Sequence, residues 1–164
     1  MTDHKIFIKT FDELTTLELH NIYLTRGLVF TVGQQITEQE IDDVDLVCHH
    51  LFSTNDDGKV IAYLRMYDLG KYADDSHEIT PGAWTIGRVA VLNEARGTGL
   101  GRRIVAEAIE WIREHTEAER IEISAQKYLE HSLYGKAGFV TEGEAYQEAG
   151  IEHVHMNLVL RENR

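Results

Sequence analysis

Apolar and polar residues follow two spacings along the chain, and these spacings predict the order of its elements. Alternation with a period of two over 5–9 and 120–126 predicts half-buried strands. An almost continuous apolar run over 84–92 predicts a strand covered on both faces. A stripe at helical spacing over 100–115 predicts an amphipathic helix. Further helices are expected over 12–28 and 130–137, and further strands over 44–53, 59–67, 139–144 and 152–160.

The ends of these elements carry signals of their own. Asp12 is expected to cap the first helix and Gly33 to end it, while 37–40 resembles a capping box for one further turn. The segment 55–58 predicts a hairpin turn. The inner side of the first helix is expected to hold Leu14, Leu17, Leu24 and Leu28.

The resulting order is β-α-(α)-β-β-β-α-β-α-β-β. It predicts an α/β fold in which a central mixed sheet is flanked by helices on both faces. No linker divides the sequence, so a single domain over 1–164 is expected.

Composition narrows the class of protein. The chain has 164 residues, of which 43% are apolar, enough for a sizeable core. A single cysteine, Cys48, excludes an intrachain disulfide and fits a reducing cytoplasm. The sequence shows neither a signal-peptide pattern nor an apolar run of the ~20 residues that a membrane-spanning helix needs. A net charge of −12 disfavours nucleic acid as a partner. Segment 88–103 is the exception, because it holds four arginines against one glutamate.

Three alternating glycines occupy 96–102, between the predicted strand 84–92 and the predicted helix 100–115. A glycine backbone can approach a ligand closely, and a helix start presents free N–H groups, so the segment favours a phosphate or pyrophosphate. A Walker A loop would need Lys followed by Ser or Thr, where Arg102 and Arg103 stand. A dinucleotide fingerprint would need a glycine at the position of Arg102.

The pattern Arg-Gly-x-Gly-Leu-Gly between strand and helix resembles motif A of the GNAT acetyltransferases. Segment 86–91 resembles the central strand of that motif, and 133–139 resembles motif B. The element order agrees over nearly the whole chain. Further segments resemble the ElaA-like subfamily, namely 24–26, 29–30, Gln34, 41–45, 125–126 and 150–156.

The resemblance implies an N-acetyltransferase that uses acetyl-CoA as cosubstrate. An amine acceptor would attack the thioester directly in a ternary complex. The loop would hold the pyrophosphate, and the strand before it would pair with the pantetheine arm. The residues implied in binding are Val89, Ala90, Val91, Arg96, Gly97, Thr98, Gly99, Leu100, Gly101 and Arg102.

Three residues are expected in catalysis. Tyr134 stands at the motif B tyrosine, whose hydroxyl could protonate the departing thiolate, and a backbone N–H near Val89 could bind the oxyanion. His153 is a candidate base, because alternation places it with His155 and Asn157 on one face of the last strand.

Asp45 is the other candidate. It is expected on the second strand with His49, on one face, where it could orient a water or bind a cationic acceptor. No spacing matches a zinc site, so no metal is expected. Three positions depart from the subfamily or family pattern, namely Gly33, where the subfamily has glutamate, Lys127, where many GNAT enzymes have asparagine, and Glu152, where the subfamily has proline.

Two other functions stay open on the sequence alone. A non-catalytic acyl-CoA sensor or interaction domain is one, because a fold does not establish turnover. A nucleotide-binding protein with an atypical loop is the other. The expected acceptor is a small-molecule or peptide amine, with no nucleic acid and no membrane as partners. The sequence leaves the acceptor, the acyl chain length and the oligomeric state open, a homodimer included.

Overall fold

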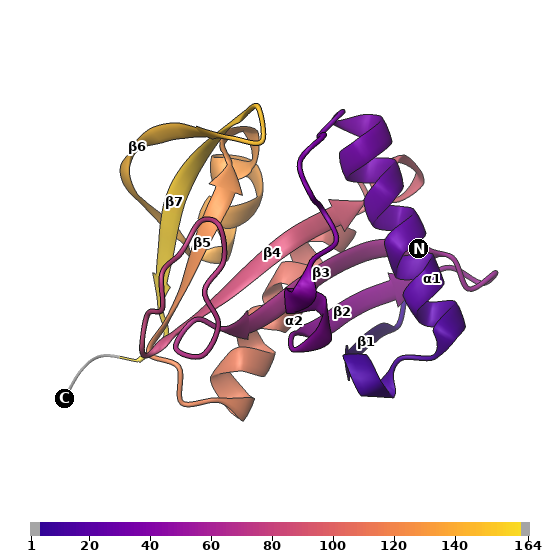
Figure 1. Ribbon diagram of the computed structural model, residues 1–164, viewed down its shortest axis with the longest axis horizontal. Helices are drawn as coiled ribbons and strands as arrows, with labels where there is room; N and C mark the ends of the chain where they lie inside the picture. The colour runs from indigo at the N-terminus through magenta and orange to yellow at the C-terminus, as the bar shows by residue number, and fades with distance from the viewer. Residues whose placement is uncertain (1–3, 162–164) are drawn as a thin grey trace. The chain divides into compact units, whose positions relative to one another are not determined.

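The computed structural model describes residues 4–161 and contains one mixed sheet of seven strands (Figure 1). The hydrogen-bonded order is β1-β2-β3-β4-β5-β7-β6. β4 pairs with β5 in parallel, and the pairs β1·β2, β2·β3, β5·β7 and β6·β7 are antiparallel. The predicted α/β class with a mixed sheet is confirmed. The strands are Ile6–Thr10 (β1), His49–Thr54 (β2), Val60–Asp68 (β3), Ala83–Val91 (β4), Arg120–Gln126 (β5), Val140–Glu148 (β6) and Ile151–Val159 (β7).

Contacts along the chain define two compact units, which are described separately below. Unit 1 comprises Met1–Met66 and Arg88–Ile104, and unit 2 comprises Tyr67–Gly87 and Val105–Arg164. The strand β4 and the helix α2, Leu100–His115, each contribute residues to both units. The bounds of α2 agree with the stripe predicted from the sequence.

Unit 1 builds a core between the helix α1, Thr16–Arg26, and the strands β2 and β3 (Figure 1). Ile22 of α1 packs against Phe52, Val60 and Tyr63, and all four side chains are almost completely buried. The hairpin turn predicted at 55–58 is present. The Asn55 side chain stabilises it by accepting the backbone N–H groups of Asp57 and Lys59.

The first helix differs from its prediction at its start and on its buried face. A 3-10 turn, Phe11–Glu13, precedes it, and Thr15 rather than Asp12 caps α1 by accepting the Glu18 N–H at 3.0 Å. Of the four leucines expected inside, Leu17 is 68% exposed and both Leu24 and Leu28 are exposed as well. The buried face instead carries Ile22, Thr25 and Arg26, because the helix covers a polar network described below. Segment 37–40 forms no helical turn.

Unit 2 holds β5, β7 and β6, the start of β4 and the larger part of α2. The α2 side chains that turn inward are apolar, and Trp111 of this helix contacts the Trp84 ring at 5.8 Å between centroids. The loop 69–82 is closed at its base by the bonds Leu69 N–H to Ala83 C=O, 2.9 Å, and Thr80 N–H to Leu69 C=O, 2.7 Å. Within residues 4–161, no helix is both long and apolar enough to span a membrane.

Candidate functional site

The glycine-rich turn of unit 1 has the open backbone that its sequence predicts. Gly97 and Gly99 adopt φ values of +76° and +86°, a left-handed region that side chains rarely enter. A Cβ atom built on either glycine meets nothing within 4 Å. The Gly99 carbonyl accepts the Arg103 N–H at 3.1 Å, so the N–H groups at the start of α2 precede the first helical bond. Unshielded donors at the start of a helix suit a pyrophosphate.

Side chains of the turn fix its shape. The Thr98 hydroxyl donates to the Ala95 carbonyl at 2.6 Å and accepts the Leu100 N–H at 3.4 Å. Arg96 donates from Nε to the Val91 carbonyl at 3.0 Å, which ties the turn to the end of β4. Arg96 therefore has a structural role besides the positive charge for which the sequence singled it out.

The backbone of β4 leaves the usual extended conformation at Arg88, immediately before Val89, although the strand continues to Val91. Arg88 adopts φ of +51°, an uncommon conformation for a residue with a side chain and one that often marks a functional site. Its guanidinium donates to the Glu40 carbonyl from Nε at 3.1 Å and from Nη2 at 3.0 Å. The same group lies 3.5 Å from the Asp42 carboxylate. These contacts join Arg88 of β4 to the segment that precedes β2.

A second group of charged side chains belongs entirely to unit 1, and its members are buried or half-buried. Arg26 donates to the Asp45 carboxylate at 2.7 Å and to the Glu40 carboxylate at 2.7 Å. Arg65 donates to the same Asp45 oxygen at 3.0 Å and to Asp42 at 2.6 Å. Burial by itself would raise the pKa of Asp42. The hydrogen bonds and the charge of Arg65, together with the charge of Arg88, outweigh burial and hold this pKa below its usual value. We call these residues, Arg26, Glu40, Asp42, Asp45 and Arg65, the arginine–carboxylate network.

The prediction that Asp45 shares a strand face with His49 is wrong. Asp45 lies in a 3-10 turn, Asp43–Leu46, which Asp42 caps by accepting the Val44 N–H at 3.1 Å, and β2 begins only at His49. Asp45 is 1% exposed and enclosed by two guanidinium groups. A carboxylate held in this way stabilises the fold and is poorly placed to take a proton from an acceptor. Alternation in the sequence could not reveal the turn.

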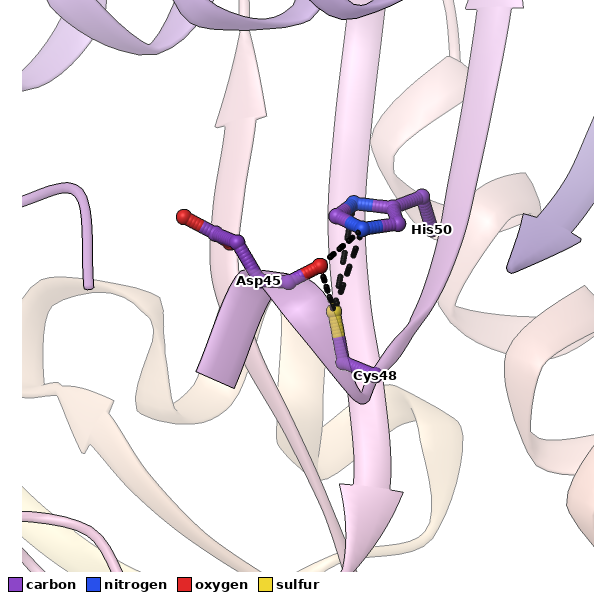
Figure 2. Close-up of side chains that lie close together, drawn as sticks. All are labelled: Asp45, Cys48 and His50. Atoms are coloured by element: carbon purple, nitrogen blue, oxygen red, sulfur yellow. Dashed lines mark hydrogen bonds between the residues drawn. The ribbon is translucent and has the colours of Figure 1, made fainter. Parts of the chain in front are cut away.

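Beside the network, Asp45, Cys48 and His50 bring together three side-chain types that bind metals (Figure 2). Figure 2 shows that the Asp45 backbone carbonyl, not its carboxylate, faces the other two residues. His50 Nε2 donates to that carbonyl at 2.8 Å, and Nδ1 accepts the Tyr63 hydroxyl at 2.6 Å, so both ring nitrogens are engaged.

The hydrogen bonds of this cluster occupy both ring nitrogens of His50, so a metal could bind the ring only by replacing one of them. Burial raises the pKa of the Cys48 thiol to about 12. Burial lowers the pKa of His50, which fits the neutral ring that its two bonds define. The cluster is therefore best described as part of the packed interior.

In unit 2, Tyr134 lies in a π-helical turn, Glu130–Gly135, where a short helix was predicted. Its ring meets Phe139 edge-on at 6.0 Å between centroids, and the residue is buried. Burial raises the pKa of the Tyr134 hydroxyl, so the group is a proton donor at neutral pH. Single π-helical turns are frequent at functional sites.

His153 also lies in unit 2, on β7, as predicted. Its register partners are Gln126 of β5 and Tyr146 of β6. Nδ1 of His153 lies 2.8 Å from the Ile151 carbonyl, and Nε2 lies 3.4 Å from the Glu148 carboxylate. The Tyr146 ring stacks on the imidazole with 6.2 Å between centroids.

Three neighbours of His153 were missed by the sequence reasoning, namely Ser124, Tyr146 and Glu148. The Tyr146 hydroxyl bonds to Ser124, and Ser124 donates to Glu148 at 3.4 Å. Their sequence signal was the antiparallel register of the last three strands, which fixes which side chains share a face. We call His153, Glu148, Ser124 and Tyr146 the β7 polar face.

The predicted residues divide between the units. Unit 1 contains the strand and turn residues 89–91 and 96–102, as well as Asp45, and unit 2 contains Tyr134 and His153. The strand β4 leads through an open glycine turn into α2, and a mixed sheet surrounds this strand. These features together define an α/β protein with a mixed sheet, in which a central strand leads through an open glycine turn into a helix.

Comparison with known proteins identifies the class further. The family model described as acetyltransferase (GNAT) domain matches residues 29–160, and the chain belongs to this acyltransferase family. Within it the chain is ElaA-like. It is 30% identical to the ElaA protein of Escherichia coli over 88% of this chain and 89% of that one. A UPF0039 protein of Schizosaccharomyces pombe is 35% identical over 98% of this chain and 100% of that one.

Solved structures agree with this assignment. An acyl-CoA N-acyltransferase from Pseudomonas aeruginosa superposes with a TM-score of 0.82 at 34% identity, covering 94% of this chain and 99% of that one. The crystal structure of Escherichia coli ElaA gives a TM-score of 0.81 at 26% identity, covering 98% and 100%. GNAT proteins generally use an acyl-CoA donor, so the expectation of an acyltransferase is confirmed at that level.

Proposed function

We propose that the chain transfers an acetyl group from acetyl-CoA to a primary amine, by direct attack in a ternary complex. The observation that carries the proposal is the turn 96–102. Gly97 and Gly99 leave its backbone unshielded, and α2 begins within it, at Leu100. Donors in this arrangement fit the pyrophosphate of a coenzyme A thioester. Bound there, acetyl-CoA would supply an activated acyl carbon.

The remaining residues have separate tasks in this proposal. The backbone of Val89, Ala90 and Val91 would pair with the pantetheine arm, and the N–H near Val89 would stabilise the oxyanion. Tyr134 would donate a proton to the leaving thiolate as the carbon–sulfur bond breaks. Burial raises the pKa of its hydroxyl, so in the resting protein this group is a weaker acid than a free tyrosine. His153 would take the proton of the acceptor amine. Asp45 has no part in the chemistry, because the two arginines enclose it.

Replacement of Gly99 by valine tests the cosubstrate site. A β-branched side chain at φ +86° strains the turn and covers the donors, so acetyl-CoA affinity should fall at least about 10-fold. Gly58→Val is the matched control, because Gly58 has φ of +82° and equally open surroundings in the β2–β3 hairpin turn. Calorimetric titration with acetyl-CoA should show a loss for Gly99→Val only. Equal affinity of the two variants would show that the site lies elsewhere.

The transfer reaction itself is tested by coenzyme A release with a panel of primary amines. Release that depends on an amine, with an acetylated product in the mass spectrum, supports the proposed function. Tight binding of acetyl-CoA without release for any amine would instead support a sensor domain on the same fold.

A further inference from the structure

The β7 polar face contains a pair of groups between which a proton donor is missing. Nδ1 of His153 lies 2.8 Å from the Ile151 carbonyl. A carbonyl oxygen can only accept, so Nδ1 carries the ring proton. In the neutral ring, Nε2 is then a bare acceptor, and this atom faces Glu148 at 3.4 Å.

Hydroxyl groups of two other residues donate hydrogen bonds to the Glu148 carboxylate. A carboxylate can only accept, so the Ser124 hydroxyl proton is directed to Glu148, and the Tyr146 hydroxyl is then the donor in its bond to Ser124. Burial and the nearby negative charges of Glu148 and Asp74 raise the pKa of the Tyr146 hydroxyl. Ser124 in turn has its own hydroxyl proton for Glu148, 3.4 Å away. Ser76, in the loop 69–82, also donates to Glu148. These directions are those of a hydrogen-bonded carboxylate rather than a carboxylic acid.

When His153 is in its neutral form, two acceptors therefore face each other at 3.4 Å, one of them charged. Neither Nε2 of a neutral His153 nor an ionised Glu148 can donate to the other. A single nitrogen at the usual separation of about 2.8 Å from both atoms would satisfy them through two of its N–H bonds. The carboxylate is partly exposed, whereas His153 is buried, so the pair is accessible from the Glu148 side.

We propose that His153 and Glu148 form a receptor for a primary ammonium group, which is the acceptor of the proposed transferase. This assignment rests on the proposed function. Glu148 holds the cation, and Nε2 of His153 takes one of its protons, which leaves a neutral amine and an imidazolium paired with the carboxylate. The amine lone pair then forms the bond to the thioester carbon, the carbon–sulfur bond breaks, and its electron pair leaves on sulfur, which takes the Tyr134 proton. The second proton, which the new amide nitrogen loses, replaces the one that Tyr134 gave to sulfur.

The charges around the pair also favour a cation. Two further carboxylates face this part of the sheet, Glu122 on β5 and Asp74 in the loop 69–82. Each already has a histidine neighbour, with His155 Nε2 lying 3.3 Å from Glu122 and His77 Nδ1 lying 3.0 Å from Asp74. Arg120 lies 3.6 Å from Glu122. Glu148 differs from these two carboxylates in its histidine neighbour. In the neutral form of His153, the nitrogen that faces Glu148 carries no proton.

Long-range proton–nitrogen NMR of the imidazoles in the full chain tests the receptor at pH 8. In the free protein, Nε2 of His153 should have the chemical shift of an unprotonated nitrogen. Methylammonium should move this resonance toward the protonated value, whereas tetramethylammonium, which has the charge but no N–H, should not. An Nε2 that is already protonated in the free protein would overturn the proposal, because the pair would then be a closed ion pair. An equal response to both cations would overturn it too.

Glu148→Gln provides a second test, because its side-chain amide supplies the missing donor internally. The KM for the amine should rise at least about 10-fold with little change in the affinity for acetyl-CoA. Glu152→Gln is the matched control, since Glu152 is an exposed carboxylate on the neighbouring strand β7.

The two hypotheses can fail separately. Amine-dependent turnover with an unchanged KM in Glu148→Gln would overturn the receptor and leave the transferase in place. A methylammonium response in NMR without turnover for any amine would support the cation site and overturn the transferase.

Discussion

Two groups of buried or half-buried titratable side chains, one in each unit, differ in the partners that their polar atoms have. The arginine–carboxylate network places two guanidiniums on one carboxylate, and Asp45 has partners at 2.7 and 3.0 Å. The β7 polar face holds a histidine and a glutamate at 3.4 Å, with hydroxyl donors on the glutamate alone. In the first group both guanidiniums bond one oxygen of Asp45, and its second oxygen, Oδ2, is buried without a hydrogen-bond partner among the residues that the structure describes. In the second group the neutral form of His153 would face the Glu148 carboxylate with a nitrogen that carries no proton.

This difference separates a structural task from a chemical one. Arginine stays charged at any accessible pH, so the first network cannot exchange protons with a substrate near neutrality. Histidine titrates near neutrality, and its unpaired nitrogen can gain a proton from a ligand. Disruption of the first group should therefore lower stability, and disruption of the second should lower activity at nearly constant stability.

The largest expected effect is on stability, from Arg26→Met. Removal of one partner from a buried ion pair leaves carboxylates without their counter-charge, and we expect a loss of about 3–5 kcal/mol in the free energy of unfolding. Urea denaturation measures it. Lys59→Met removes a pair with Glu94 that is largely exposed and should cost at most about 1 kcal/mol. Similar losses for the two variants would contradict the distinction drawn above.

Tyr134→Phe should slow acyl transfer by about 100-fold, because a positioned general acid is lost. Its affinity for acetyl-CoA and its stability should change little, since the ring keeps its packing against Phe139. Single-turnover kinetics measure the transfer step. Tyr128→Phe serves as control, because that side chain is 65% exposed and lies six residues earlier in the sequence. A normal transfer rate in Tyr134→Phe would remove this hydroxyl from the mechanism.

The smallest effect concerns His50 and the pH dependence of stability. Burial lowers the pKa of this ring in the folded state. The unfolded chain therefore binds a proton more readily, and the stability due to the neutral ring is lost as pH falls below about 6.5. Titration of this one group changes the free energy of unfolding by at most about 1.4 kcal/mol per pH unit. His50→Gln should flatten the change between pH 7.5 and 5.5 in urea denaturation, and exposed His20→Gln should not. If the parent and His50→Gln show the same slope, His50 is not the group responsible.

Much of the fold could be predicted from local patterns. The alternation in β5 and the stripe of α2 follow directly from the period of each element, and both were bounded correctly. The turn 96–102 was also predictable, because left-handed backbone and helix starts depend on glycine at particular positions. The first helix was harder. Its leucines were expected inside, but the structure buries Thr25 and Arg26, whose partners Val60, Glu40 and Asp45 lie 14 or more residues away in the sequence.

The sequence by itself thus determined the order of elements, the GNAT resemblance, the cationic glycine turn and the candidates Tyr134 and His153. Only the tertiary structure decided that Asp45 is enclosed by two arginines and that Glu148 faces His153. The physical reason is the range of the interactions. Helix and strand periods and turn geometry are set by neighbouring residues, whereas burial and pairing of a charge depend on which distant segments meet it.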